Sequence, residues 1–82
     1  MSITELLERT KAFYEKRLSA SLFLCLISAE RGSDTLAYNA ASAFIENELG
    51  VEGLDEWEGE HSEALAALDR AIGIARECEN AV

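Results

Sequence analysis

The chain has 82 residues, of which 49% are hydrophobic and 28% are charged, and its formal net charge at pH 7 is −9. A chain of this length forms one domain and buries only about 60–65% of the surface that its unfolded form exposes. We therefore expect a single domain, residues 1–82, whose marginal core is supplemented by a second copy. The negative charge argues against direct nucleic-acid binding and against an anionic membrane, and favours a protein partner with a basic surface.

The composition predicts an all-α fold. The chain has no proline, is rich in alanine, leucine and glutamate, and contains few β-branched residues, a mixture that favours helices over strands. Glycines and capping residues divide it into a three-helix bundle, with helices over about 2–31, 34–49 and 55–79 and an acidic connection at 50–55.

The first predicted helix is long. Ser2-Ile3-Thr4-Glu5 is a capping box at its start, and because no breaker occurs before Gly32, we expect it to continue to about Arg31. Its second half is apolar on all sides, which is typical of a central, fully buried helix. We expect a homodimer to cover the surface that two shorter helices leave open; the alternative is a monomer in which they wrap it completely. The predicted dimer interface consists of Leu22, Phe23, Leu24, Leu26 and Ile27.

The apolar run Leu18–Ala29 is too short to span a membrane, which takes about 20 residues. It follows the basic pair Lys16-Arg17, as a secretory signal would, but the residues before it carry acids at helical spacing, which argues against a signal. The two cysteines, Cys25 and Cys78, are too few for a disulfide framework. We therefore expect a reduced protein in the cytoplasm.

The second predicted helix follows a very short turn. Gly32 is a natural C-terminal residue for the first helix, and Ser33 or Asp34 a natural N-cap for the next, so the two helices are expected to form an antiparallel hairpin. Gly50 ends the second helix. Its inner side is predicted to carry Leu36, Ala37, Ala40, Ala41, Phe44 and Ile45, with alanines that permit close approach.

The third predicted helix has two possible starts. Asp55 with Glu58 forms a second capping box, which favours a start at Asp55; the helix-weakening Gly59 favours a start at Ser62, with Trp57 in a loop. The apolar stripe, projected at 100° per residue, contains Trp57, His61, Ala64, Leu65, Leu68, Ala71, Ile72 and Ala75.

Charge is unevenly distributed along the chain. Residues 32–69 contain ten acids and no lysine or arginine, whereas residues 1–31 carry five bases and four acids. An acidic stretch without nearby bases attracts cationic partners. The predicted partner-binding residues are Glu46, Glu52, Asp55, Glu56, Glu58, Glu60 and Glu63.

No catalytic constellation is visible. His61 is the only histidine, Cys25 lies in an apolar run where a thiolate is disfavoured, and Cys78 lies near the end of the chain. We expect no enzyme activity, no cofactor and no metal. One pattern supports an alternative: Glu58 and His61 have the Glu-x-x-His spacing of di-metal carboxylate proteins, so a ferritin-like site could be assembled across a dimer.

These observations predict a small acidic helical protein that acts by binding and occluding or regulating a protein partner, as inhibitors, antitoxins and anti-activators do. Its build resembles, in style only, that of accessory proteins of phages and mobile elements. The first alternative is a nucleic-acid mimic, whose carboxylates stand in for phosphates and block a DNA- or RNA-binding protein. The second is the di-metal protein.

Overall fold

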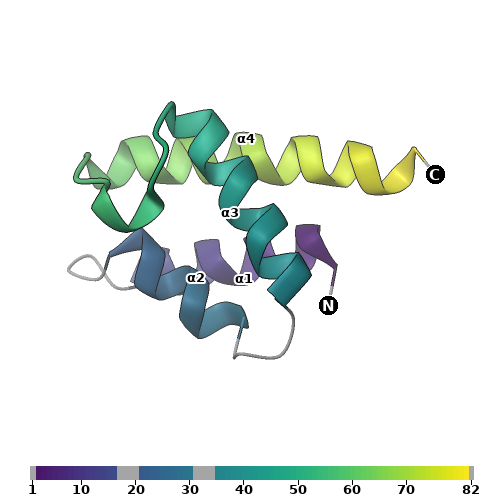
Figure 1. The fold of residues 1–82 in the computed structure, drawn as a ribbon, viewed down its shortest axis with the longest axis horizontal. Helices are drawn as coiled ribbons and strands as arrows, with labels where there is room; N and C mark the ends of the chain where they lie inside the picture. Colours follow the sequence, from purple (N-terminus) through teal and green to yellow (C-terminus); the bar gives the residue numbers. More distant parts are fainter. Residues whose placement is uncertain (1, 17–20, 31–34, 82) are drawn as a thin grey trace.

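The structure, a computed structural model, describes residues 2–16, 21–30 and 35–81. Its elements are the helices α1 (Ile3–Lys16), α2 (Leu22–Glu30), α3 (Thr35–Leu49) and α4 (His61–Asn80), with the short 3₁₀ helix η1 (Leu54–Glu56) before α4 (Figure 1). The described part of the chain contains no strand. The all-α prediction is confirmed, but the helices number four rather than three.

The long first helix was wrongly predicted. α1 ends at Lys16, and α2 begins at Leu22 and runs back along α1 in the opposite direction (Figure 1). Ser21 caps this second start, because its hydroxyl accepts the N–H of Leu24 at 3.1 Å. Because α2 packs antiparallel to α1, each helix covers apolar side chains of the other. In one continuous helix the apolar second half would be exposed to solvent on several sides.

α2 is therefore buried on one side rather than all round. Its inner face carries Leu22, Cys25, Leu26 and Ala29, all at most 3% exposed. Two residues predicted to be covered face outward: the exposed fraction is 56% for Leu24 and 40% for Ile27.

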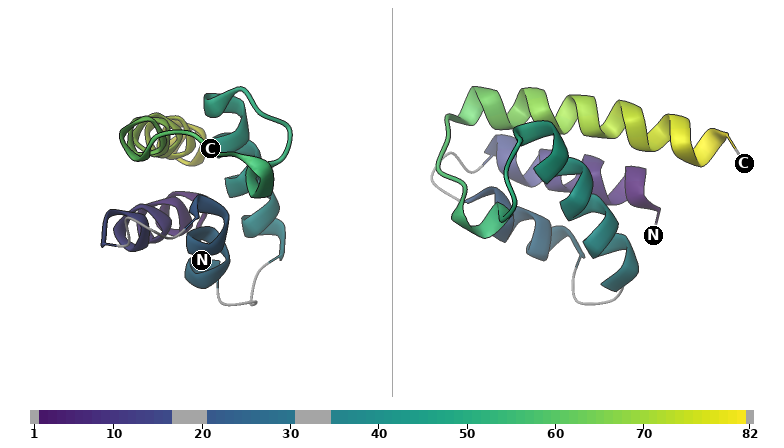
Figure 2. Two further views of the ribbon diagram at one scale, coloured as in Figure 1. Left: turned by 90° about the vertical axis from the view of Figure 1, so that its left-hand side faces the viewer. Right: turned by 45° about the horizontal axis from the view of Figure 1, so that its top comes forward.

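The helices are arranged around one core. α1 and α4 lie side by side and antiparallel, and α3 crosses them obliquely, with α2 packed against α1 and α3 (Figure 2). α1 contacts each of the other three helices. The largest fully buried side chains are Leu6, Leu7, Leu26, Ile45, Leu68 and Thr10. None of the described helices combines the length and the apolar character needed to cross a membrane.

α3 has nearly the predicted bounds. It ends at Gly50, whose φ of 71° is the left-handed conformation that favours glycine; the predicted turn at Gly32–Asp34 lies outside the described residues. Ala37, Ala41 and Ile45 are buried as predicted, and Ala40 and Phe44 are half-buried. Leu36 was placed on the wrong side: it is 83% exposed, because the buried face of α3 follows the i, i+4 row that begins at Ala37.

α4 begins at His61, next to the later of the two predicted starts. Its stripe is confirmed, because Ala64, Leu68, Ala71, Ile72 and Ala75 are buried, Leu65 packs partly buried against the core, and Ala67 is a buried addition. Trp57 precedes the helix in extended backbone, with φ −72° and ψ 131°.

Ionic contacts tie α1 to α4. Arg76 pairs with Glu8 at 2.9 Å, and Lys11 pairs with Asp69 at 2.6 Å. The hydrogen bond from Lys11 to the Asp69 carboxylate raises the pKa of the lysine. Lys11 also pairs with Glu15 within α1, at 3.5 Å. The contacts with α4 form because the antiparallel packing of the two helices brings opposite charges together.

Candidate functional site

Six of the seven predicted partner-binding residues lie on the connection between α3 and α4 or in the first turn of α4. We call residues 52–63 the acidic segment; it includes η1 and the first turn of α4. The Leu54 side chain anchors the segment, since it is 3% exposed and belongs to the core. The Glu46 carboxylate on α3 accepts the Leu54 N–H at 2.9 Å. One of the seven predicted binding acids therefore holds the segment in place rather than facing a partner.

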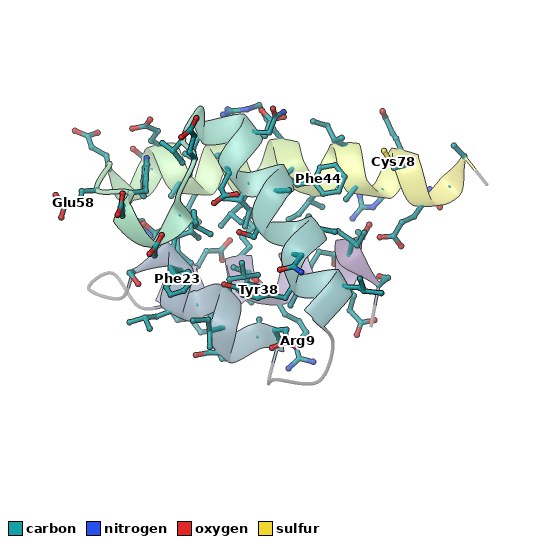
Figure 3. The ribbon with its side chains drawn as sticks, in the orientation of Figure 1. Arg9, Phe23, Tyr38, Phe44, Glu58 and Cys78 are labelled. Atoms are coloured by element: carbon teal, nitrogen blue, oxygen red, sulfur yellow. The ribbon has the colours of Figure 1, made fainter. Side chains whose placement is uncertain are left out.

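The other six predicted acids are all on the surface. They are Glu52, Asp55, Glu56, Glu58, Glu60 and Glu63, each classed as exposed. Within residues 2–16, 21–30 and 35–81, none of the six forms an ion pair, whereas Glu8, Glu48 and Asp69 are paired with Arg76, Arg70 and Lys11. The negative charge of the segment is thus uncompensated, and Glu58 projects at the end of the molecule where α4 begins (Figure 3).

The charge of this region also acts on the neighbouring helices. Burial raises the pKa of Tyr38 on α3, and the negative charges of Asp55, Glu46 and Glu30 raise it further. Tyr38 lies between α3 and α2 (Figure 3). Carboxylates from α2, α3 and the segment therefore all act on Tyr38.

Trp57 is the aromatic residue of the acidic segment. It is half-buried and packs against the core. Gly59 lies under the ring, because a Cβ at Gly59 would overlap the six-membered part of the indole. The glycine is therefore needed for the close approach of the ring, a role that its predicted effect on the start of the helix did not indicate.

His61 takes part in packing. Its ring stacks on the ring of Tyr14 in α1, with centroids 4.4 Å apart and an interplanar angle of 24°. Burial raises the pKa of Tyr14, and the buried Nδ1 atom of His61 has no hydrogen-bond partner in the part of the chain that the structure describes. The described residues contain no group of three or more histidine, cysteine or acidic side chains that could hold a metal ion. No observation favours the di-metal alternative.

The five residues predicted to form a dimer interface do not share one face of α2. Leu22 and Leu26 lie in the core, Phe23 is half-buried, and Leu24 and Ile27 are exposed. Leu22 and Leu26 could not contact a second copy without opening the fold, and the α2 interface stays a prediction.

Sequence reasoning missed a shallow groove between α1 and α4. Its apolar residues are Ala12, Ile72 and Gly73, and its charged walls are formed by the Glu8–Arg76 and Lys11–Asp69 pairs together with Glu15. The charges of those two pairs are mutually neutralised, unlike those of the acidic segment. No local pattern could have indicated the groove, because it exists only where the two helices meet.

No protein-family model, no curated protein and no solved structure significantly matches this chain.

Proposed function

We propose that this protein acts without catalysis, by binding a protein partner with a basic surface and occluding or regulating it. The observation that carries the proposal is the acidic segment, where six exposed carboxylates that form no ion pair within residues 2–16, 21–30 and 35–81 are gathered. A reducing cytoplasm is the proposed place of action, since no disulfide joins Cys25 and Cys78.

Electrostatics favour a cationic partner. Like charges close together repel one another, and lysine or arginine side chains placed opposite relieve that repulsion. The field of the segment also steers a basic surface toward it and raises the association rate. Because the Glu46–Leu54 hydrogen bond and the buried Leu54 side chain already order the backbone, binding requires little further ordering of the segment.

Trp57 would serve as the apolar anchor of the same surface. Half-buried tryptophans are frequent hot spots at protein interfaces, and an arginine can stack on the indole face. Asp55, Glu56 and Glu58 flank the ring in sequence. A partner that offers an arginine-rich segment would satisfy both the ring and the carboxylates.

The experiment compares two variants with the same change in net charge. Glu56→Gln/Glu58→Gln removes two acids of the segment, and Glu5→Gln/Glu77→Gln removes two exposed acids outside it. Each tagged protein is used to capture partners from a lysate of the source cells, and the captured protein is then titrated by calorimetry. We expect the segment variant to bind at least about tenfold more weakly, corresponding to about 1.4 kcal/mol, and the control to bind nearly as well as the wild type.

Equal loss of affinity in both variants would mean that only the net charge matters, and unchanged affinity in the segment variant would refute the proposal.

The nature of the captured protein also tests the mimic alternative. A nucleic-acid mimic requires a DNA- or RNA-binding partner whose oligonucleotide competes with this protein, whereas a partner without nucleic-acid affinity supports occlusion of another kind of surface.

A further inference from the structure

The outer face of α3 combines a protruding side chain with a hollow. Leu36 is 83% exposed, the highest value among the exposed large hydrophobic residues of the described chain. Further along the helix, a hollow of about 480 Å³ is lined by Ala40, Ala43, Phe44 and Asn47. Phe44 is half-buried and packs against the core as well as lining the hollow (Figure 3). Neither feature belongs to the acidic segment.

The four residues that line the hollow have the spacing of a hole in a coiled coil. In knobs-into-holes packing, four residues at positions i, i+3, i+4 and i+7 of one helix receive a side chain from the facing helix. Ala40, Ala43, Phe44 and Asn47 stand in that relation. Leu36 lies one turn before Ala40 and therefore on the same face of the helix. The face thus carries both a knob and a hole.

Charge also distinguishes this face. The stretch Thr35–Ile45 contains no charged residue. Two copies that each carry a net charge of −9 repel each other, so they can approach with least repulsion where a helix presents uncharged side chains. The small side chains of Ala40 and Ala43 allow two helices to come close together.

We infer that a second copy of this chain docks on the outer face of α3, with the two α3 helices antiparallel about a two-fold axis. Each Leu36 enters the hollow of the other copy, so one surface supplies both halves of the contact, as a two-fold dimer requires. When Leu36 faces Ala43 and Phe44, the two copies of Ala40 lie opposite each other near the axis. This interface differs from the α2 interface predicted from the sequence.

Sedimentation equilibrium across micromolar to millimolar concentration tests the inference. We expect the wild type to reach twice the 9.0 kDa chain mass. Leu36→Ser, which removes the knob, and Ala43→Glu, which places a charge in the hole, should each raise the dissociation constant by at least about tenfold. The matched control is Leu24→Ser, on the exposed face of α2, which should leave the constant unchanged. Circular dichroism verifies that each variant is folded.

A cysteine cross-link tests the antiparallel geometry. In a Cys78→Ser background, Ala40→Cys should form a disulfide-linked dimer on mild oxidation, and Ala66→Cys, at an exposed position on α4, should not. A wild type that stays at 9.0 kDa throughout, a dimer weakened by Leu24→Ser but not by Leu36→Ser, or equal cross-linking at both cysteines would each overturn the inference.

Discussion

At the scale of single residues, Glu79 completes a helix that lies far away in the sequence. Its carboxylate accepts the Thr4 N–H at 2.7 Å and the Thr4 hydroxyl at 2.9 Å. The first N–H groups of a helix have no partner within the helix, and a negative charge is favourable at that end. Ser2 accepts the Glu5 N–H at 3.0 Å, so one local and one distant residue share the capping of α1.

The charge of Glu79 predicts a pH dependence. The hydrogen bonds from Thr4, first from the backbone N–H and then from the hydroxyl, lower the pKa of Glu79 below its ordinary value of 4.5. A lowered folded-state pKa contributes stability that is complete above the ordinary value and is lost as the pH falls through the folded value. We expect Glu79→Gln to lower the melting temperature at pH 7, and the difference to shrink below about pH 4.

Thermal unfolding followed by circular dichroism from pH 7 to pH 2 provides the measurement. Glu77→Gln is the control, because Glu77 is an exposed acid on the same helix, and it should change the melting temperature little at any pH. A difference for Glu79→Gln that persists undiminished at pH 2 would assign its effect to something other than charge.

At the scale of elements, α2 carries apolar residues on all sides but is buried on one side only. Leu26 is fully buried, whereas Leu24 on the opposite face is 56% exposed. The sequence contains a signal for the α2 start, because Ser21 stands where an N-cap is required and does bond the Leu24 N–H. The predicted continuous helix ran through this serine, since nothing local distinguishes an N-cap serine from a serine inside a helix.

The one-sided burial predicts unequal stability effects along α2. Leu26→Ala should lower the free energy of unfolding by about 2–5 kcal/mol, because it leaves a cavity in the core. Leu24→Ala should change the free energy by no more than about 0.5 kcal/mol. Urea denaturation at low protein concentration measures the free energy of unfolding of both variants. Comparable losses would mean that α2 is covered on both faces, as in the continuous central helix or the α2 dimer expected from the sequence.

At the scale of the whole molecule, the distribution of charge sets the response to salt. The described ion pairs join α1 with α4, α3 with α4, and two residues of α1, while the acidic segment contributes unpaired negative charge. Repulsion within a chain of net charge −9 destabilises the compact state. We expect the melting temperature to rise between very low salt and about 0.15 M NaCl, where the Debye length is about 8 Å.

The rise should be smaller in Glu56→Gln/Glu58→Gln than in Glu5→Gln/Glu77→Gln, because the first variant removes two acids that lie among the other exposed acids of the acidic segment, whereas the second removes two acids outside it. Differential scanning calorimetry of the wild type and the two variants in the same buffers measures the rise in melting temperature. A melting temperature that falls steadily with added salt would show that the ion pairs outweigh the repulsion.

Local sequence patterns were enough to predict the all-α class, the cap at Ser2, the end of α3 before Gly50, the apolar stripe of α4 and the concentration of acids in the acidic segment. Each of these depends on residues within one or two turns of one another, where periodicity, capping and backbone conformation act. The chemical nature of the candidate site was therefore predictable from the residues alone, although its anchoring by Glu46 and Leu54 was not.

Other features follow from long-range packing alone. They are the fold-back of α2, the exposure of Leu36, the packing of the Trp57 ring over Gly59, and the partners of Glu8, Lys11 and Glu79. These features depend on which apolar helix faces bury each other, because that packing brings together charges that are distant in the sequence. Many arrangements of the same stripes satisfy the local rules, and the choice among them is made by the sum of long-range contacts.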